Sequence, residues 1–227
     1  MPVASATGRT TASPCASGVS HWKNKSIAIT PQKHSYYNNK KNQLYFKLTI
    51  NKLHRWWQRR GFGIESKTDF AFLHDVLREE TPYYAYLEWQ RDYPHATQEE
   101  RSLSQLLFRI SNHLQPSAVS IHGNADSLTT HAIKQGCRKT TVSTSSTPYF
   151  KLSCTDFSAR LESGMIVEYA PSNEHPDSIA AIVLTHIDTS NAALWQRITA
   201  MPTITYDMRH TGIALLRKGR YPEHYHI

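Results

Sequence analysis

The sequence predicts an α/β fold, in which a mostly parallel sheet ends in an antiparallel hairpin and follows a cap of helices. The main indication is residues 117–136 (SAVSIHGNADSLTTHAIKQG), where a short apolar strand, a turn of small and polar residues and a helix succeed one another. α/β proteins open a nucleotide or cofactor site in this way after a core strand. Apolar segments then alternate with helical ones, and residues 203–207 and 212–217 flank a short polar turn, as in a hairpin.

Basic residues are concentrated in the first quarter of the chain. Residues 1–60 contain 11 of the 26 Lys and Arg and none of the 18 Asp and Glu, so the remaining residues carry a net charge of −3. Residues 1–42 are rich in Ser, Thr, Ala and Asn and are predicted to be a disordered basic extension. Residues 1–60 are either a solvated extension or a segment that contacts a polyanion, such as nucleic acid or an anionic lipid surface.

The cysteines and the hydropathy of the chain indicate its compartment. Cys15, Cys137 and Cys154 are widely spaced and form no C-x-x-C pair, which is typical of idle thiols in a reducing environment. No apolar run has the length of a transmembrane helix, and the first residues lack the apolar block of a secretory signal. We therefore expect a cytoplasmic protein without a transmembrane segment.

Residues 43–116 are predicted to form a helical cap. Four large apolar residues share one face of its first helix: Phe46, Ile50, Leu53 and Trp57. This helix is expected to end on Arg59 and Arg60 before a glycine, although its LYFKLTI stretch also has strand propensity. The arginines beside Trp56 either form an electrostatic footprint or only complement the end of the helix.

Two further helices are predicted in the cap. Residues 66–69 match a capping box and start a helix that extends to Glu80. A clean stripe of leucine and isoleucine residues marks a second helix from about Gln98 to Leu114. The tyrosines of residues 83–86 lie between these helices, where they either line a pocket or pack against the next element.

Residues 117–227 are predicted to form the α/β domain. After its first strand and helix, four segments have strand propensity: 139–144, 150–154, 165–170 and 179–187. Only five residues separate the first two segments, whereas a parallel pair needs a crossover of about a dozen residues or more. The third strand is therefore either absent or antiparallel, and a crossover helix is expected to be missing. An antiparallel strand inserted at the end of a parallel sheet is typical of the class I S-adenosylmethionine-dependent methyltransferase fold.

Five segments give the chain a more specific resemblance: RGFGI (60–64), TPYYAY (81–86), LSQLLFRISNHLQPS (103–117), IAAIVLTHI (179–187) and HTGIALLRKG (210–219). In this order they resemble a family of bacterial O-methyltransferase-like proteins. The resemblance covers about residue 44 to the C terminus. It implies a helical cap followed by a class I methyltransferase domain that uses S-adenosylmethionine.

The resemblance also identifies where the cofactor would bind. The family's first strand is expected to end in an acid and a Gly-x-x-x-Gly turn, which lets the backbone approach the methionine and ribose of the cofactor. Here Ser120 stands for the acid, His122 for the first glycine and Asp126 for the last. Only Gly123 remains, displaced by one position. Because a Cβ at these places intrudes on the ligand and makes positive φ costly, we expect a degenerate cofactor site.

Positions after the later strands depart from the family as well. Ser143 replaces the acid that holds both ribose hydroxyls, and it offers a single hydrogen bond instead of a charge-assisted bidentate contact. Glu168 is the only acid at a strand end that is suited to act as a general base. Thr185 and His186 replace the paired acids of metal-dependent members. His186 and Asp188 are a weak metal signal, and a hydrogen-bonded histidine at a strand end explains the pair more simply, so no metal is expected.

Three functions follow from these observations. The first is a methyltransferase-like protein with a degenerate cofactor site and weak or no catalysis. If active, it would transfer a methyl group from S-adenosylmethionine to an oxygen or nitrogen acceptor, with Glu168 as base. The second is a binding module that contacts nucleic acid or an anionic surface through the basic segment, with the α/β domain as scaffold. The third is a protein–protein element that uses the aromatic residues of the cap.

Overall fold

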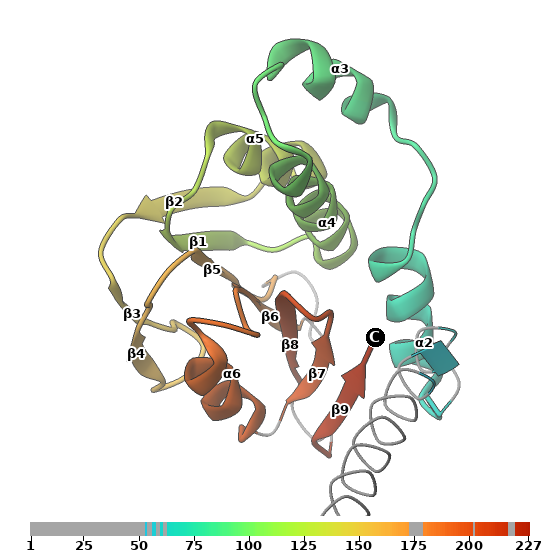
Figure 1. The fold of residues 1–227 in the computed structure, drawn as a ribbon, viewed down its shortest axis with the longest axis vertical. Coiled ribbons are helices and arrows are strands. Elements are labelled where there is room, and N and C mark those ends of the chain that lie inside the picture. Colours follow the sequence, from blue (N-terminus) through green and yellow to red (C-terminus); the bar gives the residue numbers. More distant parts are fainter. Residues whose placement is uncertain are drawn as a thin grey trace, which may run out of the picture. The chain divides into compact units, whose positions relative to one another are not determined.

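The computed structural model describes residues 53, 56–57, 60, 63–172, 179–201, 203–217 and 221–227, all of which belong to one unit, residues 47–227. The predicted disordered extension and most of the first helix of the cap lie outside the described residues. Of that helix, Leu53, Trp56 and Trp57 are helical and Arg60 lies in a turn. The described residues form an α/β fold (Figure 1), which confirms the predicted class.

The helices that precede the sheet are α2 (Lys67–Phe72), its π-helical continuation η1 (Leu73–Leu77), α3 (Tyr84–Asp92) and α4 (Gln98–Leu114). Ser66 caps α2 as predicted, because its Oγ accepts a hydrogen bond of 3.3 Å from Asp69 N. Thr97 and Glu100 form a reciprocal capping box that fixes the start of α4.

Helix α3 is an element that the sequence pattern does not predict. Its tyrosines belong to a small apolar cluster: Tyr83 and Tyr86 pack edge-on against Phe108 of α4, with ring centroids 5.1 and 5.9 Å away. Trp89 is buried in the same cluster. Of the two predicted alternatives for these rings, packing is therefore the one observed, while Tyr84 points to solvent.

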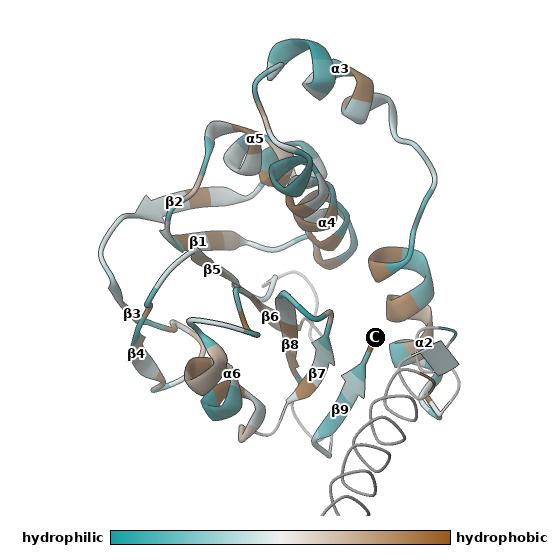
Figure 2. Ribbon diagram, viewed as in Figure 1, coloured by the Kyte–Doolittle hydropathy of each residue, from teal (hydrophilic) through white to brown (hydrophobic). Residues whose placement is uncertain are grey.

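Seven strands form the main sheet, in the order β2-β1-β5-β6-β8-β7-β9. Their bounds are β1 (Ala118–Gly123), β2 (Thr141–Ser145), β5 (Met165–Tyr169), β6 (Ala180–Thr185), β7 (Ile204–Asp207), β8 (Thr211–Leu216) and β9 (Glu223–His226). Helix α5 (Ser127–Gly136) follows β1 and helix α6 (Ala192–Thr199) follows β6, as predicted. Strand β9 is not predicted because its sequence EHYH is mostly polar, and Figure 2 shows it as hydrophilic.

Five of the seven strands run in one direction, and β5 and β8 run in the opposite direction. The pairs β1–β2 and β7–β9 are therefore parallel, whereas each reversed strand is antiparallel to both of its neighbours. The predicted terminal hairpin is confirmed as β7–β8. The reversal of β5 differs from the doubly wound arrangement, in which the corresponding strand would be parallel to β1.

The reason for this reversal lies in residues 146–164, which connect β2 to β5. They contain no helix and only the hairpin of β3 (Tyr149–Lys151) and β4 (Ser158–Arg160), a separate two-stranded sheet. The predicted third strand is thus absent from the main sheet and pairs antiparallel outside it. Without a crossover helix to return the chain to the other edge, β5 starts at the edge where β1 and β2 end.

Hydrophobic residues cover both faces of the sheet. Val167 of β5 and Val183 of β6 belong to the core under α2, η1, α4 and α5. Ile166 and Ile182, their neighbours in sequence, belong to the core under α6 and the β3–β4 hairpin. All residues of β5 and β6 are buried. This two-sided burial explains why both segments read as continuous apolar runs in the sequence.

Candidate functional site

The predicted cofactor position is the carboxyl end of β1, and the chain itself fills it. Gly123 has a φ of +102°, and a Cβ added there would overlap the carbonyl oxygen of Gly164 and lie 2.7 Å from Leu161 Cδ2. Asn124 N donates a hydrogen bond of 3.0 Å to the same carbonyl oxygen. Gly123 is therefore required by the close approach of residues 161–164, the segment that leads into the reversed strand β5.

A buried asparagine makes three of the hydrogen bonds that hold this segment in place. Asn191, fully buried before α6, donates hydrogen bonds of 2.8 Å from Nδ2 to the carbonyl oxygens of Ser163 and Thr185. Its Oδ1 accepts a hydrogen bond of 3.2 Å from Glu162 N. Thr185 Oγ1 adds a contact of 2.9 Å with Met165 N. The segment 161–164 is thus tied to the end of β6 by hydrogen bonds to both its N–H and C=O groups.

Asp126, which the sequence resemblance aligns with the last glycine of the expected cofactor turn, caps helix α5. Its carboxylate accepts a hydrogen bond of 2.5 Å from Thr129 N, and its backbone is extended, as at other helix N-caps. The carboxylate also lies at the positive end of the helix dipole. An aspartate immediately before a helical segment is a common capping signal, so this role could have been found in the sequence.

Three of the predicted site residues lie side by side across three strands. Ser120 of β1 is paired in register with Ser143 of β2 on one side and with Glu168 of β5 on the other. Ser143 Oγ donates to Ser120 Oγ at 3.2 Å and lies 3.4 Å from Val119 O. The two serines therefore bond to each other, and the structure brings Glu168 next to them although its strand is reversed.

Glu168 is a buried carboxylate, 2% exposed, which the segment after β3 covers. Its Oε1 accepts hydrogen bonds of 2.9 Å from Ser153 Oγ and 3.0 Å from Cys154 N. Residues 151–156 also line a surface depression that is wide open to solvent, and Glu168 does not line it. A general base needs direct or water-mediated access to a substrate, which this cover withholds from Glu168.

Cys154 is exposed as a residue, but its thiol faces the Glu168 carboxylate. Partial burial of the thiol, and next its interaction with Glu168, raise the pKa of Cys154 to about 12. The thiol is therefore protonated at neutral pH. Since the thiolate is the nucleophilic form of cysteine, Cys154 is not an activated nucleophile.

His122, which the sequence resemblance aligns with the first glycine of the expected cofactor turn, is half-buried beside the β3–β4 hairpin. Its ring centroid lies 5.8 Å from that of Phe150, and its Nδ1 is buried without a hydrogen-bond partner. The imidazole thus packs against the hairpin on the same face of the sheet as Ser120.

The two residues weighed as metal ligands after β6 contact other groups. His186 has a φ of +58°, and its Nδ1 lies 3.4 Å from Thr185 Oγ1. Asp188 Oδ2 lies 2.7 Å from His210 Nδ1 instead of facing His186. Among the described residues, no group of three or more His, Cys, Asp and Glu is placed to hold a metal ion.

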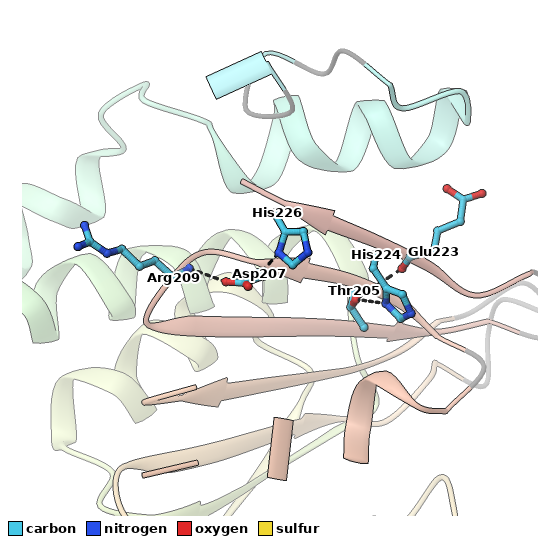
Figure 3. Close-up of polar contacts among 6 residues, drawn as sticks. All are labelled: Thr205, Asp207, Arg209, Glu223, His224 and His226. Atoms are coloured by element: carbon cyan, nitrogen blue, oxygen red, sulfur yellow. Dashed lines mark hydrogen bonds and ion pairs between the residues drawn. The ribbon is translucent and has the colours of Figure 1, made fainter. Parts of the chain in front are cut away.

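A second group of polar residues joins the last strand to the sheet (Figure 3). His226 Nδ1 of β9 lies 3.0 Å from Asp207 Oδ2 of β7, and Asp207 Oδ1 accepts a hydrogen bond of 2.8 Å from Arg209 N. His224 Nδ1 lies 2.7 Å from the buried Thr205 Oγ1. Each histidine of the tail therefore contacts a side chain of β7, which aligns β9 with its parallel neighbour.

No helix within the described ranges is long and apolar enough to cross a membrane. No protein-family model matches the sequence, and neither a curated protein nor a solved structure shows significant similarity to the chain.

Proposed function

We propose that this chain is a methyltransferase-like protein whose cofactor position is filled by its own residues 161–164, and that it acts without transferring methyl groups. Two features support the family. The main sheet begins in the order β2-β1-β5-β6. These strands are the second, first, fourth and fifth that the sequence predicts, and a doubly wound sheet has its strands in the same order. In addition, the antiparallel strand β8 is inserted between β6 and β7, as expected for the class I methyltransferase fold.

The observation that carries the proposal is the contact between Gly123 and Gly164. In doubly wound folds the ligand lies in a crevice outside the carboxyl ends of the strands, where the strand order changes direction. In this chain that point lies between β1 and β5, and the segment entering β5 passes over it. Because the hydrogen bonds of Asn191 hold the segment, a cofactor would have to displace a bonded loop before it reached the β1 backbone.

Calorimetric titration of the full chain with S-adenosylmethionine tests this proposal. We expect no binding tighter than about 100 μM, which corresponds to a free energy of about −5.5 kcal/mol. An active class I methyltransferase titrated in the same buffer is the control for the cofactor stock. A dissociation constant well below that limit would mean that residues 161–164 leave the site open, and the proposal would fail.

A second candidate function is the binding of a polyanion through residues 1–60. The observation in its favour is the charge distribution, with 11 basic and no acidic residues in this segment. We expect the chain to shift a polynucleotide in a gel, with an affinity that falls as salt is raised. Removing residues 1–42 deletes six of the 11 basic residues and should weaken binding. If this truncation leaves the affinity unchanged, the basic extension is not the contact.

A further inference from the structure

Three large apolar side chains lie close together on the surface at the start of the described chain. Leu53, Trp56 and Trp57 are helical and 54%, 47% and 54% exposed. Trp56 and Trp57 follow Leu53 by three and four positions, which places the three side chains on one face of a helix. The sequence pattern predicts Leu53 and Trp57 on the inner face of a cap helix, whereas both are exposed to solvent. A cluster of exposed apolar side chains marks an interaction surface more often than a single exposed apolar side chain does.

The sequence around these side chains is basic. The guanidinium of Arg60 lies 4.1 Å from the ring centroid of Trp56, and Arg60 N donates a hydrogen bond of 3.0 Å to Trp57 O. Lys52, Arg55 and Arg59 alternate with the apolar residues in the sequence, and the first acidic residue of the chain is Glu65. The partner of this surface should therefore be anionic and should also accept aliphatic and indole side chains.

A phospholipid bilayer with anionic headgroups meets both requirements. Its headgroup phosphates attract lysine and arginine, and the boundary beneath them accepts leucine and tryptophan. A nucleic acid meets the charge requirement and stacks on indole rings, but it offers no place for an aliphatic side chain such as Leu53. The basic residues also have long apolar stems that allow their charges to remain at the headgroups while neighbouring side chains enter the boundary.

We propose that Leu53, Trp56, Trp57 and Arg60 form a docking surface for an anionic phospholipid bilayer. This inference rests on the polyanion-binding function and names its partner. Leu53 and the two indoles enter the boundary between headgroups and acyl chains, and Arg60 contacts a headgroup phosphate. Each basic residue near such a surface strengthens binding by about fivefold. Insertion of the apolar side chains makes the interaction specific for lipid.

The test uses the full chain and two sets of vesicles, one of phosphatidylcholine alone and one that also contains phosphatidylglycerol. Each set is prepared with and without brominated acyl chains, which quench a tryptophan that enters the bilayer. We expect sedimentation with the phosphatidylglycerol vesicles and quenching by the brominated lipid. Replacing both indoles (Trp56→Ala with Trp57→Ala) should lower the partition coefficient by at least about tenfold. Arg60→Ala should lower it by about fivefold.

A control substitution and a single-stranded oligonucleotide distinguish lipid docking from the other possible outcomes. Tyr84→Ala removes an exposed aromatic side chain of α3 and should leave binding unchanged. Vesicle binding without quenching, or binding that survives loss of both indoles, would overturn the docking surface while leaving polyanion binding in place. Absence of vesicle binding would overturn it too. If the indole variant loses binding to a single-stranded oligonucleotide and the chain ignores vesicles, the surface recognises nucleic acid instead.

Discussion

The two sides of the first core strand, β1, differ in how closely they follow a doubly wound α/β fold. On the β2 side, β1 and β2 are parallel and α5 follows the turn with a capped N terminus. On the β5 side the neighbouring strand is reversed, and the segment that leads into it lies on Gly123. The absence of a helix between β2 and β5 thus has two consequences: β5 is reversed, and a connecting loop lies at the edge of the sheet where doubly wound folds bind their ligands.

Among substitutions on the β5 side of β1, a side chain at Gly123 should destabilise the protein most. In Gly123→Ala, the new Cβ would overlap the Gly164 carbonyl oxygen, and the φ of +102° disfavours any L-residue. We expect the free energy of unfolding, measured in urea, to fall by about 3 kcal/mol or more.

Gly63→Ala is the control, because Gly63 also has a positive φ, of +84°, but among the described residues no atom beyond its chain neighbours lies within 4 Å of a Cβ added there. That substitution should cost only the backbone strain, about 1 kcal/mol. Equal losses at the two glycines would show that the contact with Gly164 is unimportant.

Asn191→Ala should have the next largest effect, because it leaves the carbonyl oxygens of Ser163 and Thr185 and the N–H of Glu162 without their partner. We expect a loss of about 3 kcal/mol and faster amide hydrogen exchange in residues 161–165. Asn191→Asp keeps the acceptor for Glu162 N but removes both donors, so it should be destabilising as well. Unchanged exchange in both variants would mean that other contacts hold the segment.

The same two sides explain which parts of the structure can be predicted from the sequence. The strand, turn and helix of residues 117–136 and the β7–β8 hairpin have local patterns, and both are predicted correctly. The direction of β5 is not predicted, because a strand buried on both faces has the same apolar run whether it is parallel or antiparallel. Nor is the role of Asn191, since a lone asparagine gives no sign of hydrogen bonds to Glu162 and Ser163, which lie 29 and 28 positions earlier in the chain.

On the β2 side, Asp126 caps helix α5 at a position where the sequence resemblance predicts a glycine of the cofactor turn. Asp126→Ala removes the acceptor for Thr129 N and should reduce stability by about 1 kcal/mol. Asp126→Gly introduces the residue that the sequence resemblance predicts here and should cost only a few tenths of a kcal/mol, because glycine is tolerated at this position. Neither variant should gain affinity for S-adenosylmethionine, since the obstruction lies on the other side of β1. A gain in Asp126→Gly would place the defect in the turn rather than in residues 161–164.

The smallest expected effect concerns residues 151–156, the segment that covers Glu168 and separates this predicted base from solvent. With a pKa of about 12, Cys154 is a thiolate in only about one molecule in ten thousand at pH 8. Iodoacetamide should therefore modify Cys154 slowly. The rate should continue to rise with pH above the pH range in which an ordinary thiol ionises. Glu168→Gln removes the negative charge and should lower the pKa and accelerate the reaction at neutral pH. The pKa should still exceed its ordinary value, because burial is the larger cause.

Peptide-level mass spectrometry reads this reaction at Cys154 alone. Asp156→Asn removes an exposed carboxylate from the same segment, one that pairs with Lys151, and should leave the rate unchanged. If Cys154 of the unaltered chain reacts as fast as the thiol of an unstructured peptide, residues 151–156 do not stay on Glu168 in solution. Glu168 would then be accessible at the surface, and its role as a base would have to be tested directly with Glu168→Gln in a methyl-transfer assay.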